Sequence, residues 1–339
     1  MSQAASSSGA TGNREWDQWE HRFAPVGDGF QLHFVDVGPR DATPVVLVHG
    51  WPDLWFAWRL LVCLLLSDLR GYGRSSAPAD IEAYGSKNLT SDLAELLDFL
   101  NLPRAVFVGH DWGGAIVWCM CLYHPSRVLA VCGICTPYFP QPDQCVDTAT
   151  LIQAFPQFSY MRFLSQSGAA AKALDSAPRR VFTATFRLPE EHKVDGVSVP
   201  FLEILEGVAS ATGDDEGMSW YTQHSEVITE QELDYYVQEY SHSGFKGSCN
   251  YYAVRVLDFE TENPLPRVIP HKALYIGASA DPVLKPEMAA HMPPFVPNLE
   301  TALVEGGGHW LLWSHKHEVS EILTKWLAKV EDVSDIAAP

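Results

Sequence analysis

The segment at residues 105–114 places the tightest constraint on how this 339-residue chain can fold. Its apolar run AVFVG is typical of a buried strand, and the run leads directly into HDWGG and the helical pattern AIVWCMCLY. Such a sharp turn needs glycines, because side chains at Gly109 or Gly113 would collide with the adjoining strand or helix. The segment therefore predicts a strand, a strained turn at Asp111 and then a helix.

Comparable apolar runs recur along the chain and are separated by helical patterns. Strands are expected over residues 31–38, 44–50, 105–111, 128–136, 272–281 and 300–309, with a final helix over 319–330. Strands that alternate with helices favour a mainly parallel sheet with helices on both faces, the α/β class.

The middle of the chain has a different pattern. Over residues 140–264 the strand signal is replaced by aromatic residues, prolines and helical stretches such as EQELDYYVQEY. We interpret this stretch as a helical insertion between two strands of the sheet, because the strand pattern resumes after it. The core then consists of residues 15–139 and 265–339, and the small polar residues 1–14 are expected to form a disordered tail.

Charge and cysteine usage exclude several classes of partner. The net charge of -19 argues against nucleic acid or an anionic membrane surface, since both are bound through Lys and Arg. No apolar run is long enough to span a membrane. The seven cysteines lie mostly in apolar runs and are expected to be free thiols in a cytoplasmic protein. Cys132 and Cys135 form a C-x-x-C without a second pair, so no metal site is predicted.

Asp111 is the candidate nucleophile of the chain. A carboxylate is already anionic at neutral pH and needs no base before it attacks. Its attack on an sp3 carbon gives an alkyl ester that water can hydrolyse, which points to an epoxide or an alkyl halide as substrate. The structural alternative is an aspartate that only caps the following helix.

A histidine and a second acid near the C-terminus complete a candidate triad. His309 follows a predicted strand and three glycines, and Asp281 ends the strand before it. The order nucleophile, acid, histidine is the one expected when a G-x-D-x-G turn carries the nucleophile. Asp281 would then orient the imidazole. The alternatives are a turn role for Asp281 before Pro282 and a weaker acid candidate, Glu305, within the strand.

The run His49-Gly50-Trp51-Pro52 follows another predicted strand. Backbone N–H groups just after such a strand and just after the nucleophile form an oxyanion hole in this kind of site. The backbone N–H groups of Trp51 and Trp112 are therefore the candidates. Taken alone, the run is also compatible with a simple strand-ending turn.

Together the segments HGWPDLWFAWR, DLRGYGRSSAP, GHDWGG, GASADPV and GGGHW resemble the soluble epoxide hydrolases of the α/β-hydrolase fold. The resemblance implies that Tyr160 in FSYMRF and Tyr252 in GFKGSCNYYAV donate hydrogen bonds to the epoxide oxygen. It implies an epoxide and water as reactants, no metal or organic cofactor, and a monomer or homodimer. We further expect four residues in the substrate pocket: His49, Pro52, His110 and Tyr251.

One segment departs from that family pattern. Only LLVCLLLS, residues 60–67, stands where the family has a helix, a turn and a buried strand. We expect this run to supply the strand and to leave the helix stunted, which would expose apolar sheet. The shortened segment motivates one alternative, an inactive hydrolase-like scaffold. A haloalkane dehalogenase also stays open, because it would share Asp111, the histidine and the fold, with Trp112 as a halide donor.

Overall fold

The computed structural model describes residues 15–27, 29–39, 42–61, 65–194, 197–210 and 223–334. The predicted tail at residues 1–14 lies outside this part of the chain. The described residues form an eight-stranded sheet in the order β1-β2-β4-β3-β5-β6-β9-β10 and a two-stranded hairpin, β7-β8. The strands are β1 (His21–Val26), β2 (Phe30–Asp36), β3 (Val45–Val48), β4 (Leu65–Ser67), β5 (Ala105–His110), β6 (Val128–Ile134), β7 (Lys193–Val194), β8 (Val197–Ser198), β9 (Lys272–Ala278) and β10 (Leu299–Val304).

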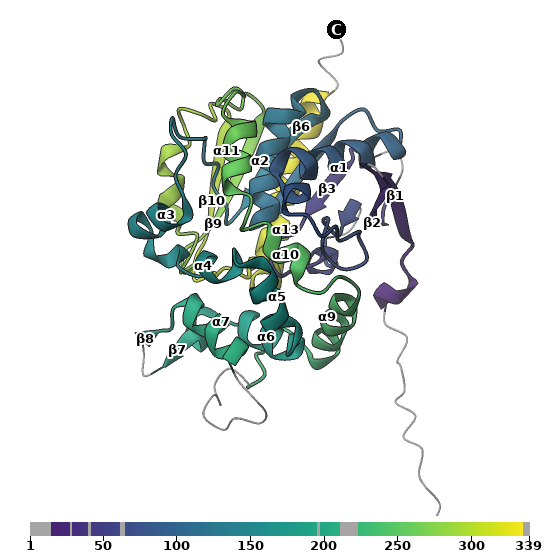
Figure 1. Cartoon of the computed structure of the whole chain (residues 1–339). Coiled ribbons are helices and arrows are strands. Elements are labelled where there is room, and N and C mark those ends of the chain that lie inside the picture. The colour runs from purple at the N-terminus through teal and green to yellow at the C-terminus, as the bar shows by residue number, and fades with distance from the viewer. Residues whose placement is uncertain are drawn as a thin grey trace, which may run out of the picture.

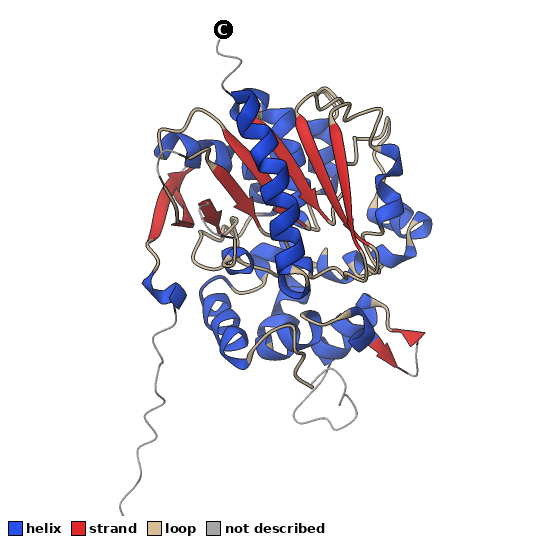
Figure 2. Ribbon diagram, turned by 180° about the vertical axis from the view of Figure 1, so that it is seen from behind, coloured by secondary structure: helices blue, strands red, loops and turns tan. Residues whose placement is uncertain are grey.

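The sheet is parallel from β4 to β10, and it is antiparallel where β1 pairs with β2 and β2 with β4. All residues of the central strands β3 and β5 are buried, which matches their unbroken apolar runs. Helices α1 (Ser86–Phe99), α2 (Trp112–Tyr123), α12 (Leu311–Ser314) and α13 (Lys316–Ser334) belong to this core. Figure 1 shows α1 and α2 on one face of the sheet, and Figure 2 shows the long C-terminal helix crossing the opposite face. The predicted two-sided α/β fold is confirmed.

Strand β1 was not predicted from the sequence. Its segment HRFAPV contains Arg22 and Pro25 and does not form an apolar run. A proline is tolerated there because β1 is an edge strand, paired on one side only.

Short helices occupy most of the chain between β6 and β9, although these two strands are neighbours in the sheet. They are α3 (Thr148–Ala154), α4 (Met161–Leu164), α5 (Ser167–Asp175), α6 (Pro178–Thr185), α7 (Phe201–Ser210), α9 (Glu230–Ser243), α10 (Lys246–Asn250) and α11 (Arg255–Glu262). In both views α5, α6, α7 and α9 lie beyond one end of the strands. The described residues within 140–264 are mostly helical, with the hairpin β7-β8 as an addition.

The shortened segment forms a strand, as expected, and it is preceded by a single 3-10 turn, η2 (Trp55–Trp58). Residues 62–64 lie outside the described part of the chain. The expected exposure is not observed in β4, where Leu65 and Leu66 are 6% and 1% exposed. Strand β4 lies between β2 and β3, and the turn η2 packs close to it. The turn η2 is itself buried, and Phe56 packs on Tyr235 of α9 with ring centroids 4.6 Å apart.

The six cysteines within the described residues are all free, and four of them are buried; Cys63 lies outside this part of the chain. Within the described residues, none of the helices combines the length and the apolar character needed to cross a membrane.

Candidate active site

The turn between β5 and α2 holds Asp111 in a conformation that few residues adopt, with φ 53° and ψ -122°. Glycines make this turn possible. A Cβ on Gly109 would lie 2.1 Å from the carbonyl oxygen of Gly113, and a Cβ on Gly113 would lie 2.0 Å from that of Val48. The steric requirement predicted from the sequence is confirmed. Gly50 has a further role, because a Cβ there would lie 2.4 Å from the Asp111 side chain.

Backbone donors surround the Asp111 carboxylate. The N–H of Trp51 donates to Oδ1 at 2.7 Å, and the N–H of Trp112 also donates to this carboxylate. The hydroxyl of Thr136 donates to the Asp111 carbonyl at 2.7 Å and fixes the turn from the end of β6. The two N–H groups predicted as an oxyanion hole therefore point at the candidate nucleophile.

His309 and Asp281 lie beside Asp111, each just after a strand. His309 Nδ1 lies 2.8 Å from Asp281 Oδ2, and its Nε2 lies 3.6 Å from Asp111 Oδ2. The other oxygen of Asp281 accepts hydrogen bonds from the N–H groups of Val283 and Leu284 at 2.8 and 2.9 Å. The structure thus brings the three predicted triad residues together. Glu305, the weaker candidate acid, is exposed.

The charges of these three groups are coupled. Burial alone lowers the pKa of His309, but Asp281 and Asp111 outweigh it and raise that pKa to about 9. Burial alone raises the pKa of Asp281, whereas His309 and the two N–H donors hold it below its usual value. For Asp111, burial raises the pKa against the opposing effects of His309 and the backbone donors. The arrangement favours an imidazolium between two carboxylates.

A cavity of about 720 Å³ opens in front of Asp111 and His309. Tyr160 and Tyr252, from two separate segments of the insertion, both line it. Their rings lie 5.9 Å apart, and burial raises the pKa of both hydroxyls well above the ordinary value. Both groups are therefore protonated donors over the whole neutral range.

Four residues expected in the pocket do not line this cavity. His49 is fully buried and accepts a hydrogen bond from the N–H of Leu69 at 3.0 Å. His110 is 1% exposed and bonds to the carbonyl of His309, and the carbonyl of Pro52 accepts from Tyr240. Tyr251 bonds through its hydroxyl to the carbonyl of Arg70. They lie close to the reactive residues in sequence, but they are outside this cavity and form hydrogen bonds with the surrounding loops and helices.

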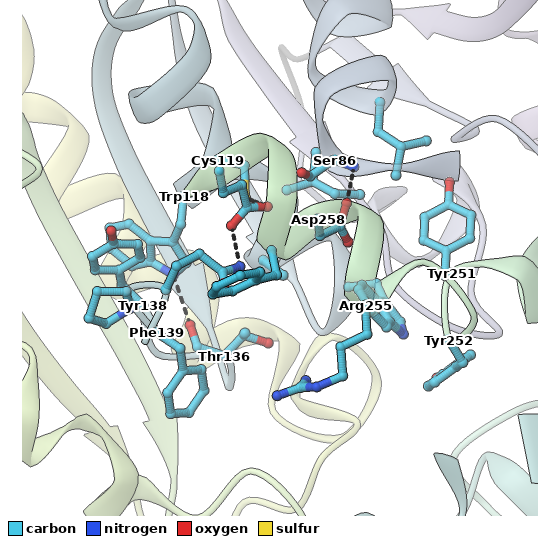
Figure 3. Close-up of a pocket in the computed structure, with 18 of the residues that line it drawn as sticks. Ser86, Trp118, Cys119, Thr136, Tyr138, Phe139, Tyr251, Tyr252, Arg255 and Asp258 are labelled. Carbon is cyan, nitrogen blue, oxygen red and sulfur yellow. Dashed lines mark hydrogen bonds between the residues drawn. The ribbon is translucent and has the colours of Figure 1, made fainter. Parts of the chain in front are cut away.

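A second, smaller cavity of about 230 Å³ lies on the other side of Trp112 and Tyr252. Figure 3 shows it, with Tyr138 and Phe139 across from Tyr251 and Tyr252, and Arg255 reaching into the space between them. Trp112 lines this second cavity and is not among the residues that line the first.

Sequence reasoning missed several residues of the main cavity. Arg187, His192 and Phe201 line it and come from the insertion. Phe201 packs on Tyr160 with ring centroids 5.3 Å apart. None of these residues lies in a motif, so only the packing of the insertion against the core reveals them.

One group of metal-ligating side chains, His110, Cys135 and His309, comes together within the described residues. The imidazole of His110 and the thiol of Cys135 are both directed at the carbonyl of His309. Burial raises the pKa of the thiol well above its usual value, so the thiolate that a metal would require is disfavoured. These contacts are better explained as supports for the His309 loop.

Comparisons with known proteins agree with this geometry. A family model described as the alpha/beta hydrolase fold matches residues 43–316, and one described as the epoxide hydrolase N terminus matches residues 10–58. The bifunctional epoxide hydrolase 2 of Mus musculus is 34% identical over 316 residues. The match covers 91% of this chain but 55% of the mouse protein, so the chain spans about half the length of that relative.

Two mycobacterial proteins match over nearly their full length. Epoxide hydrolase A of Mycobacterium tuberculosis is 32% identical over 321 residues, which cover 90% of this chain and 96% of the relative. The crystal structure of epoxide hydrolase A from Mycobacterium thermoresistibile superimposes with a TM-score of 0.76 at 30% identity, over 91% of this chain and 98% of that one. The chain therefore belongs to the epoxide hydrolase family of the α/β-hydrolase fold.

Proposed function

We propose that this protein hydrolyses epoxides to vicinal diols through an ester on Asp111. The observation that carries the proposal is the meeting of two sets of groups in one cavity. A carboxylate with a histidine–acid pair faces two protonated tyrosines. A nucleophile and proton donors around one space suit the opening of a strained ring whose oxygen stays on the product.

In the first step, an oxygen of Asp111 attacks one epoxide carbon and the bond between that carbon and the ring oxygen breaks. Tyr160 and Tyr252 donate hydrogen bonds to the ring oxygen, and one of them transfers its proton to it. The ring oxygen thereby becomes the hydroxyl of a hydroxyalkyl ester, and that tyrosine is left as a phenolate. An alkoxide is far more basic than a phenolate, so a tyrosine with a raised pKa still serves as a donor.

In the second step, water attacks the ester carbonyl of Asp111 and the diol leaves. Esterification removes the negative charge of Asp111, which is one of the causes of the raised pKa of His309. The pKa of His309 therefore falls once the ester forms, and the imidazolium returns its proton to the tyrosine phenolate. The neutral Nε2 can then accept a proton from water. The N–H groups of Trp51 and Trp112 stabilise the negative charge that develops on the carbonyl oxygen.

In this proposal the insertion at residues 140–264 acts as a lid over the sheet edge, because it supplies both tyrosines and walls of the cavity. The roles of the individual residues, a cytoplasmic location and a monomeric or dimeric state remain predictions.

The alternative reaction, dehalogenation, would use the same triad. One observation keeps it worth testing: the indole N–H of Trp51 is buried without a hydrogen-bond partner among the described residues. The test is to incubate the purified protein with styrene oxide and with a haloalkane and to measure diol and halide. Diol without halide supports the proposal. Halide without diol would replace it with dehalogenation, and turnover of neither by a well-folded protein would favour an inactive scaffold.

A further inference from the structure

Tyr160, one of the two proposed proton donors, differs from other buried tyrosines of the insertion in how its side chain is held. Tyr236, Tyr240 and Tyr251 each donate a hydrogen bond to an oxygen of the core. The Tyr160 side chain is also buried, at 6% exposed, but within the part of the chain that the structure describes its hydroxyl forms no hydrogen bond to the protein. The hydroxyl is therefore left available to a substrate, and the position of the ring depends on packing.

The packing on the Tyr160 ring comes from two aromatic residues. Phe201, the first residue of α7, meets it edge-on, with ring centroids 5.3 Å apart and ring planes at 75°. Tyr252 meets it at 5.9 Å and 78°. Helix α4, which begins directly after Tyr160, packs against α7. Because Tyr252 is itself a proposed proton donor, Phe201 is the contact whose role the mechanism does not yet explain.

Phe201 also completes a ring of four aromatic side chains beside the nucleophile. It packs edge-on against Trp51 at 6.0 Å, and Trp51 packs edge-on against Tyr252 at 6.2 Å. Together with Tyr160, these residues line the cavity in front of Asp111. Phe201 thus lies between a proposed proton donor and the loop whose N–H group donates to the nucleophile.

The loop that carries Trp51 is held by contacts of its own. The N–H of Asp53 donates to the carbonyl of Gly50 at 2.9 Å. The carbonyl of Pro52 accepts a hydrogen bond from a tyrosine of α9, also at 2.9 Å. Removing the ring of Phe201 would therefore leave the oxyanion-hole loop in place and would take support away from the tyrosine.

We propose that Phe201 is a positioning residue for ring opening, which keeps the Tyr160 hydroxyl where it can donate to the epoxide oxygen while Asp111 attacks. This inference rests on the proposed epoxide hydrolysis. A proton donor accelerates the reaction only when it lies within hydrogen-bond reach of the leaving oxygen. A small displacement of a positioned group is costly to the rate. Since Phe201 acts through Tyr160, its effect is confined to ester formation.

A double-mutant cycle tests this. Wild type, Phe201→Ala, Tyr160→Phe and the double variant are compared by rapid-quench measurement of ester formation and of ester hydrolysis at saturating styrene oxide. Phe155→Ala is the matched control. Phe155 is an aromatic residue of the same insertion, is 40% exposed and is not among the residues that line the main cavity.

We expect Phe201→Ala to slow ester formation by roughly fivefold to tenfold, close to the effect of Tyr160→Phe. In the Tyr160→Phe background the same change should slow it by less than about twofold, because the hydroxyl that Phe201 positions is already gone. Ester hydrolysis should stay near the wild-type rate in each variant, which also shows that the variants are folded. Phe155→Ala should behave as wild type in both steps.

Three results would overturn the inference. Ester formation could be unaffected by Phe201→Ala, or it could be slowed equally with and without the Tyr160 hydroxyl, as expected if Phe201 acts on the substrate directly. Slower ester hydrolysis in Phe201→Ala would mean that the ring supports the Trp51 loop instead. If wild type forms no ester and no diol from any epoxide, the proposed epoxide hydrolysis fails, and this failure is distinct from the other three.

Discussion

The carboxyl ends of the parallel strands, here called the sheet edge, and the helical insertion contribute to the same cavity in different ways. At the sheet edge, Asp111, Asp281 and His309 each follow a strand, and backbone geometry fixes where their side chains lie. In the insertion, Tyr160 and Phe201 lie on or beside short helices that are held by aromatic packing. In the proposed mechanism, the backbone of the core therefore positions the reacting groups, whereas the packing of the insertion positions the side chains that would contact the substrate.

The largest effect should follow from a change at the sheet edge. Replacing Asp111 with alanine removes the nucleophile, and we expect diol formation to fall by at least about 10⁴-fold. Steady-state assays on styrene oxide measure this. Glu305→Gln is the matched control, since it neutralises the acid that the structure leaves exposed on the same edge. A residual activity of Asp111→Ala within tenfold of wild type would break the account.

A second change at the sheet edge should separate the two steps. In His309→Gln the ester can still form, but water is no longer activated, so turnover should fall by about 10³-fold or more. Intact-protein mass spectrometry should then show the protein carrying one bound substrate. An unmodified protein after incubation with the epoxide would mean that His309 is needed before the ester forms.

Changes in the insertion should affect only the first step. Tyr160→Phe and Tyr252→Phe should each slow ester formation by roughly tenfold, and the double variant by about 10² or more. Rapid-quench measurement of ester formation and decay checks this, and decay should stay near the wild-type rate. Slower hydrolysis of the ester with an unchanged rate of ester formation would mean that the tyrosines act in the second step, and it would contradict the comparison.

The smallest effect concerns stability and pH. The pKa of His309 is raised to about 9 from an ordinary 6.5, so its contribution to stability is complete below pH 6.5 and is lost as the pH rises towards 9. We expect the melting temperature of wild type to exceed that of His309→Gln by a few degrees at pH 6. This corresponds to a difference in the free energy of unfolding on the order of 2 kcal/mol. The difference should shrink by pH 9.5. A difference that grows with pH would mean that the imidazole is neutral in the folded protein.

Sequence alone predicted much of the core and little of the insertion's interior. The loops that carry residues 111, 281 and 309 could be found because buried parallel strands are continuous apolar runs, and because the turn at Asp111 admits only glycine at Gly109 and Gly113. The strands β9 and β10 end earlier than predicted, at Ala278 and Val304. His49 and His110 were misjudged, since proximity in sequence to a reactive residue does not reveal which side of a loop a ring occupies.

Phe201 shows what local pattern cannot reveal. Its significance lies in the rings that it contacts, those of Tyr160 and Trp51, and that depends on packing between segments far apart in the chain. The shortened segment that contains β4 illustrates the opposite error. Exposure was expected there, but the side chains of Leu65 and Leu66 are buried.

The central claim is that an oxygen of Asp111 itself enters the diol. A single turnover of excess protein on an epoxide in oxygen-18 water tests it directly, with mass spectrometry of the diol and of the peptide that contains Asp111. We predict an unlabelled diol and a peptide heavier by about 2 Da, because water attacks the Asp111 carbonyl. A labelled diol from that first turnover, with an unlabelled peptide, would mean that water opens the ring directly and would contradict the account.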